Sequence, residues 1–88
     1  MLPVVPLATG SVEVGGADVP IRSLSRSEVV GLTKYGDDTT SAEVFMVAKS
    51  CGLSEDEARA WLDATDAATA GELLKAIARI SGIASGEA

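Results

Sequence analysis

The sequence predicts a small, mainly α-helical fold: a bundle of about four short helices preceded by an N-terminal β-hairpin. Two observations support this prediction. First, the stretch VEVGGADVPIR, residues 12–22, alternates apolar and polar positions around a Gly-Gly pair, which is the pattern of a tight hairpin. Second, helix-start signals recur along the alanine-rich chain that follows. With 88 residues, the chain is expected to form one domain over residues 12–83.

In the predicted hairpin, Val12 and Val14 share a face on the first strand, and Val19 and Ile21 share a face on the second. Gly15 and Gly16 stand where a two-residue turn needs positive φ. Pro20 has no amide hydrogen to donate, so the second strand is expected to be an edge strand. Because an isolated hairpin is marginally stable in water, we expect it to pack on the helices or to pair with another strand.

Residues 1–11 are predicted to form an irregular or extended apolar arm. Pro3 and Pro6 exclude a helix interior, and they interrupt an apolar run that also lacks the basic start of a signal peptide. The arm is interpreted either as a frayed terminus or as a segment that docks on the domain or on a partner.

The four helices are predicted at about residues 26–35, 41–51, 55–64 and 67–81. The first three begin at capping boxes, in which a Ser or Thr precedes a Glu by three residues: Ser25–Glu28, Thr40–Glu43 and Ser54–Glu57. The last helix begins at Asp66 or at a fourth box that starts with Thr69. Gly36, Gly52 and Gly82 are expected to end the first, second and last helix. Residues 84–88 are predicted to be a flexible tail.

Composition argues against several classes of function. The net charge is −6, and the seven basic residues are scattered, which disfavours nucleic acid and membrane surfaces as partners. Cys51 is the single cysteine and there is no histidine, so an internal disulfide and a Cys/His zinc site are excluded. No apolar stretch is long enough to span a bilayer, and we expect a cytoplasmic location.

No catalytic, cofactor-binding or metal-binding set is predicted, and we expect the protein not to be an enzyme. Histidine, the usual general base near neutral pH, is absent. The acidic runs 37–38 and 55–57 lack the alternating oxygen ligands of a calcium loop. An acyl carrier function would require an Asp before Ser23-Leu24, where Arg22 stands. A helix-turn-helix DNA reader over residues 55–81 would present acidic side chains to phosphates.

The apolar side chains of the last two helices are the candidate partner-binding residues. Trp61 is either a core anchor or an exposed contact, and the apolar arc of the last helix is wider than packing in a small bundle requires. The candidates are Trp61, Leu62, Leu73, Leu74, Ile77 and Ile80.

Two motifs resemble a known family. Residues 21–28, IRSLSRSE, match a strand that enters a helix through the pattern β-Arg-x-Leu-(Ser/Thr)-x-x-Glu, and residues 80–83, ISGI, match a hydrophobic–Ser-Gly–hydrophobic helix end. In this order, residues 12–83 resemble the tail assembly chaperones of long-tailed, siphovirus-type bacteriophages. The resemblance implies a non-enzymatic protein of the host cytoplasm, absent from the mature virion. Such a protein binds the phage tape measure protein and assists assembly of the tail tube protein.

Alternatives for the function and for the role of the hairpin stay open at this point. The chain could be a structural head–tail connector or tail protein, or a small acidic protein-binding regulator. The hairpin could cover one end of the helical core, or its edge could add a strand to a partner or to a second copy in self-association. Under the leading interpretation, a net charge of −6 keeps the protein soluble while it exposes apolar surface.

Overall fold

The computed structural model describes residues 2–3 and 5–83, and the predicted tail at 84–88 lies outside these residues. The elements are β1 (Thr9–Val14), β2 (Ala17–Arg22), α1 (Arg26–Gly31), a 3-10 helix η1 (Leu32–Tyr35), α2 (Thr39–Cys51), α3 (Glu55–Ala64) and α4 (Ala67–Ile80). This is the small, mainly α-helical fold with an N-terminal antiparallel hairpin that the sequence predicts. No helix in the described part of the chain is both long and apolar enough to cross a membrane.

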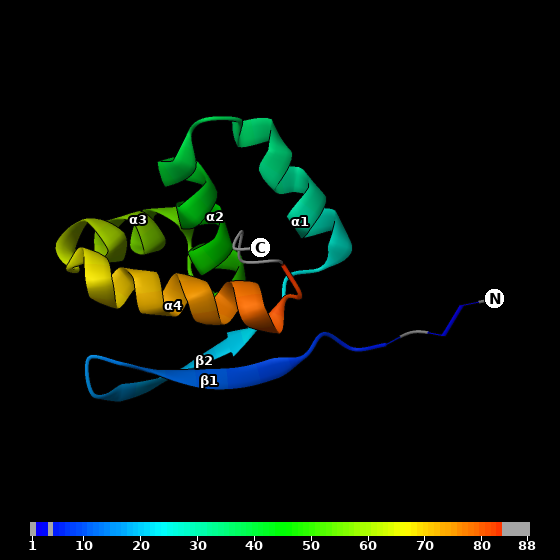
Figure 1. The fold of residues 1–88 in the computed structure, drawn as a ribbon, viewed down its shortest axis with the longest axis horizontal. Helices are drawn as coiled ribbons and strands as arrows, with labels where there is room; N and C mark the ends of the chain where they lie inside the picture. The colour runs from blue at the N-terminus through cyan, green and yellow to red at the C-terminus, as the bar shows by residue number, and fades with distance from the viewer. Residues whose placement is uncertain (1, 4, 84–88) are drawn as a thin grey trace, which may run out of the picture.

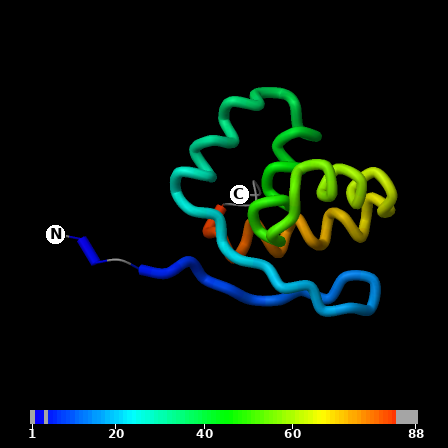
Figure 2. Tube along the Cα trace, turned by 180° about the vertical axis from the view of Figure 1, so that it is seen from behind, coloured from blue at the N-terminus to red at the C-terminus, as the bar shows by residue number. Residues whose placement is uncertain are grey.

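The hairpin forms one layer and the helices form the other (Figure 1). It runs along α4, with β1 against α4 and β2 against α2 and α4. The view from behind shows the N-terminal segment leaving on the side of the molecule where α1 lies (Figure 2). The expectation that the hairpin packs on the helices is therefore confirmed.

The hairpin turn has the predicted geometry, but the first strand is longer than predicted. Gly15 and Gly16 have φ of 59° and 85°, and Val14 pairs with Ala17 across them. β1 begins at Thr9, so residues 9–11 belong to the sheet and not to the arm. Residues 7–14 contain no proline, so no backbone N–H donor is missing from this strand. The pairing with β2 extends to Thr9, which lies opposite Arg22.

Two of the predicted capping boxes form with both hydrogen bonds. Ser25 Oγ accepts the Glu28 N–H at 3.1 Å, and the Glu28 carboxylate accepts the Ser25 N–H at 2.9 Å. Ser54 and Glu57 repeat this arrangement at the start of α3, with the same two distances. The predicted start of α3 is therefore confirmed.

The other helix starts are capped by aspartates. Asp38 accepts the Ser41 N–H at 3.1 Å and the Ser41 hydroxyl at 2.7 Å, so α2 begins at Thr39 and the predicted box at Thr40 is wrong. Asp66 accepts both groups of Thr69 in the same way, which confirms the earlier of the two predicted starts for α4. At both helix starts the Asp carboxylate accepts two hydrogen bonds, and its negative charge is stabilised by the positive end of the helix dipole. These two effects explain why an aspartate caps the helix in place of a threonine.

The predicted helix at 26–35 is divided. It is α-helical only as far as Gly31 and continues as the 3-10 helix η1 to Tyr35. Glycine and the β-branched Val29, Val30 and Thr33 are weak helix formers, and α1 buries no residue that would offset this.

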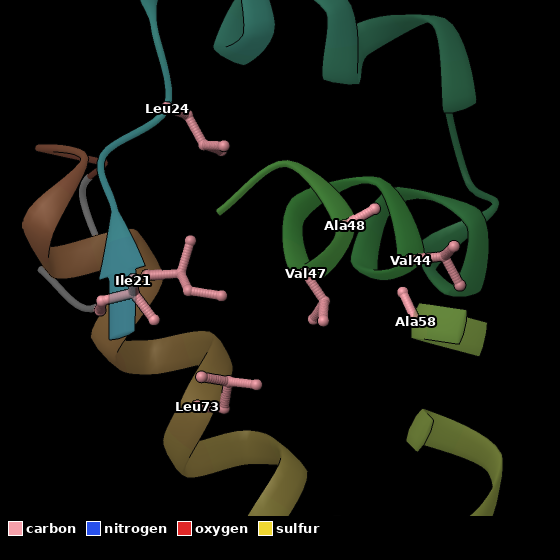
Figure 3. Packing of buried hydrophobic residues seen from close by; sticks show 8 residues of the cluster. Ile21, Leu24, Val44, Val47, Ala48, Ala58 and Leu73 are labelled. Carbon is pink, nitrogen blue, oxygen red and sulfur yellow. The ribbon is translucent and has the colours of Figure 1, made fainter. Parts of the chain in front are cut away.

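The core lies between the hairpin and the helices (Figure 3). Side chains from β2, α2, α3 and α4 point into one interior, together with Leu24. Its buried members are Ile21, Leu24, Val44, Val47, Ala48, Ala58, Leu73 and Ile77. None of them is aromatic, so α2, α3 and α4 approach one another through small and aliphatic side chains.

The junction between β2 and α1 explains the Arg-x-Leu-Ser-x-x-Glu pattern in physical terms. Arg22 forms a two-pronged ion pair with Glu28, with Nη1–Oε1 at 2.9 Å and Nη2–Oε2 at 3.0 Å. The hydrogen bond from Arg22 is the main reason that the pKa of Glu28 falls from 4.5 to about 2. The strand is thereby connected to the capping box that starts α1.

Three serines hold the backbone of the same junction. Ser50 Oγ of α2 donates to the Arg22 carbonyl at 2.7 Å and accepts the Arg22 N–H at 3.3 Å. Ser23 Oγ accepts the Ala8 N–H at 3.0 Å. Ser81 Oγ, at the end of α4, accepts the Leu24 N–H at 2.9 Å.

Candidate functional site

An open groove of about 1000 Å³ lies between α2 and α4, and we call it the α2–α4 groove. Its lining residues are Thr39, Ala42, Glu43 and Met46 of α2, Gly71, Leu74, Lys75, Ala78 and Arg79 of α4, and Gly82 and Ile83 beyond it.

The groove follows from the residue pattern of the two helices. Its α2 residues recur at i, i+3, i+4 and i+7, which places them on one face beside the face that packs into the core. Its α4 residues follow the same rule. Ala42, Gly71 and Ala78 have little or no side chain, so the outward faces leave a depression where the core faces meet.

Gly71 is the least expected residue of this surface, because it lies inside α4. Glycine in a helix interior is roughly 0.5–1 kcal/mol less favourable than alanine. A Cβ placed on Gly71 would meet no atom within 4 Å, so internal packing does not require glycine there. At Gly10, by contrast, a Cβ would lie 3.2 Å from Ile80 Cδ1, because β1 passes close to α4.

The charges along the groove differ from those of the whole chain. Lys75 and Arg79 stand one turn apart on α4, and Glu43 stands on α2. The lining therefore carries two positive charges and one negative charge, on a chain whose net charge is −6. Lys75 lies 3.9 Å from Glu72, and both side chains are about 70% exposed, so this pair holds Lys75 only weakly.

A smaller hollow of about 330 Å³ adjoins the groove between α2, α3 and α4. The two share Glu43, Gly71 and Leu74, and the hollow adds Leu62 of α3. The groove therefore continues past Leu74 into a hollow with mixed polar and apolar lining, which reaches the end of α3.

The structure separates the six candidate residues into three groups. Leu74 lines the groove and Leu62 lines the adjoining hollow. Trp61 and Ile80 are half-buried against the core and line neither cavity.

Leu73 and Ile77 form the third group, and they correct the predicted surface. They are only 2% and 0% exposed, so they are core residues and offer no surface to a partner. The apolar arc of α4 is wide because one part faces the core while its edge, at Leu74, reaches the groove.

Sequence reasoning missed most of the groove, above all Ala42, Met46, Gly71, Ala78 and the two cations of α4. The sequence feature that could have indicated the groove is Gly71, a glycine inside a predicted helix, which stands seven residues before Ala78 on the same helix face.

Two other clusters have structural explanations. Lys34 Nζ lies 5.1 Å from the centre of the Tyr35 ring, and Lys49 Nζ lies 5.7 Å from the centre of the Phe45 ring. The centres of the two rings are 6.0 Å apart, so these contacts hold η1 against α2.

Cys51 is half-buried, and burial raises the pKa of its thiol. Within residues 2–3 and 5–83, no three His, Cys, Asp or Glu side chains are grouped as metal ligands.

Comparison with protein families, with curated proteins and with solved structures finds no match for this chain. The fold and the groove together define a class: a small, mainly α-helical protein with a lateral groove lined by apolar, small and charged residues. Its function is inferred from this groove and from the resemblance of residues 12–83.

Proposed function

We propose that the protein is a non-enzymatic tail assembly chaperone of a siphovirus-type phage. In this proposal it acts in the host cytoplasm, where it binds hydrophobic helical segments of the tape measure protein and assists assembly of the tail tube. The observation that carries the proposal is the α2–α4 groove, an open apolar channel on an acidic body. The resemblance in the strand–helix junction supplies the kind of partner.

The lining of the groove suits a helix in its chemistry. A partner helix binds such a surface through residues at i, i+3, i+4 and i+7. Met46 and Leu74 offer apolar contacts, while Gly71 and Ala78 allow close approach of the partner. Burial of apolar side chains from the partner would keep it soluble until assembly.

Co-expression with the tape measure protein of the same phage tests the proposal. The double variant Ala42→Gln/Ala78→Gln fills the groove without removing a core side chain. Its control, Ala60→Gln/Ala68→Gln, makes the same change at exposed helical positions outside both cavities. We expect the wild type and the control to raise the soluble fraction of the tape measure protein and the groove variant to lose this effect. No effect of the wild type would refute the proposal.

A structural particle component is the second candidate, and the N-terminal arm favours it. Leu2 and Val5 are 87% and 75% exposed on a segment that extends away from the domain (Figure 1). Apolar side chains that the chain itself leaves uncovered suit a permanent contact in an assembly. Mass spectrometry of purified particles separates the two functions: a structural component is present in fixed copy number, whereas a chaperone is absent.

A further inference from the structure

We infer that the α2–α4 groove selects an amphipathic partner helix with acidic residues on the flank that lies along α4. This inference rests on the proposed function, because it specifies the chemistry of the helix that the groove receives. It follows from where the positive charges of this acidic chain are placed and from which of them are free to pair.

Positive charge is scarce on this chain, and part of it lies at the groove. The sequence has 13 acidic and seven basic residues, yet two of the seven line the groove. Arg22 is engaged by Glu28, and Lys34 and Lys49 lie over aromatic rings. Lys34 and Lys49 keep their charge over the Phe45 ring, and Arg26 and Arg59 are exposed elsewhere. The groove differs from these places because its two cations border a hollow with apolar lining residues such as Met46 and Leu74.

The two cations of the groove, Lys75 and Arg79, are available to a partner. Among the described residues, Arg79 takes part in no ion pair, and Lys75 has only the loose contact with Glu72. Both side chains belong to exposed residues on the outer face of α4. A partner carboxylate therefore has no strong internal pair to displace.

The spacing of the two cations matches the repeat of a bound helix. Positions 75 and 79 are four residues apart, so their Cα atoms are separated by about 6 Å along the helix axis. Two carboxylates at i and i+4 on a helix laid along α4 have the same spacing. Glu43 lines the groove from α2, the helix opposite α4, where it repels a carboxylate and accepts a lysine or arginine. The groove thus distinguishes the two flanks of a bound helix.

The test uses three synthetic helical peptides with one Leu/Ala face. They differ only at two positions, i and i+4, on one flank, which carry Glu, Lys or the neutral Gln. Binding is measured by fluorescence anisotropy at low and at high salt. The protein is used as the wild type, as Lys75→Glu/Arg79→Glu, and as Arg26→Glu/Arg59→Glu. The last variant makes the same change in net charge at exposed positions outside the groove, and circular dichroism verifies that each variant is folded.

We expect the Glu peptide to bind the wild type about tenfold more tightly than the Lys peptide at low salt, and this ratio to shrink as salt screens the exposed charges. The Lys75→Glu/Arg79→Glu variant should reverse the order, and Arg26→Glu/Arg59→Glu should preserve it.

Equal binding of all three peptides would overturn the inference and leave the groove as a binding site, in keeping with the proposed function. Tighter binding of the Lys peptide to the wild type would also overturn it, because net charge would then govern selection. Failure of all three peptides to bind would overturn the groove itself and, with it, this part of the proposed function.

Discussion

Replacing Gly71 with alanine is expected to stabilise the protein. Gly71 lies in the interior of α4, its φ is not positive, and a Cβ there meets no atom within 4 Å. Alanine therefore lowers the entropy of the unfolded chain and favours the helix without a steric penalty. The expected gain is roughly 0.5–1 kcal/mol.

The assay is thermal and urea unfolding followed by circular dichroism. For a domain of this size, a gain of this magnitude raises Tm by about 2–8 °C. Gly16→Ala is the opposite control: its φ of 85° strains any residue with a Cβ, so Tm should fall. Gly10→Ala should gain less than Gly71→Ala, because Ile80 Cδ1 must move to admit the new methyl group.

The same substitution should weaken binding of a helical partner, because the methyl group occupies space that the groove leaves open. A protein that becomes more stable and binds less well would show that glycine is retained at position 71 for the partner and not for the fold. A Gly71→Ala protein with unchanged or reduced stability would refute this reasoning, because the helix would then require glycine for an internal reason.

Three further predictions concern the junction and the core. Glu28→Gln should lower the free energy of unfolding by about 1–3 kcal/mol at pH 7. The pKa of Glu28 is about 2 in the folded protein and 4.5 in the unfolded chain, so this stabilisation is present above pH 4.5 and is lost as the pH falls towards 2. The difference in Tm between wild type and variant should therefore vanish at low pH. Ser50→Ala should cost about 1–3 kcal/mol in urea unfolding, because the Arg22 carbonyl loses its partner, and a change within error would contradict that role. Ile77→Ala should lower the free energy of unfolding by about 2–5 kcal/mol, and Leu74→Ala should lower it clearly less, because Ile77 is fully buried and Leu74 faces the groove. Equal losses in urea unfolding would mean that Leu74 belongs to the core.

Local features of the fold were readable from the sequence because neighbouring residues determine them. The Gly15-Gly16 turn and the box from Ser54 to Glu57 involve residues at most three positions apart, and both form as predicted. The start of α2 was misplaced because Asp38 and Thr40 are both capping residues, and only the geometry of the loop shows which one accepts the Ser41 N–H.

The groove could not be predicted in the same way. It depends on how α2 and α4 pack, and these helices meet through residues distant in sequence, such as Val47 and Leu73. Hydrophobic periodicity identified the apolar arc of α4, but Leu73 and Leu74 are adjacent in sequence and differ in role. Small residues such as Ala42 give only a weak hydrophobic signal, although they line the groove.

The serine contacts at the junction have a consequence for when folding finishes. The hydrogen bond from the Leu24 N–H to Ser81 Oγ joins residues 57 positions apart, at the beginning and the end of the domain. During synthesis the hairpin and the first helices emerge before the residue that closes this contact exists. The native junction is therefore completed only after residue 81 has left the ribosome, and a chain that stops before it keeps the Leu24 amide without this acceptor.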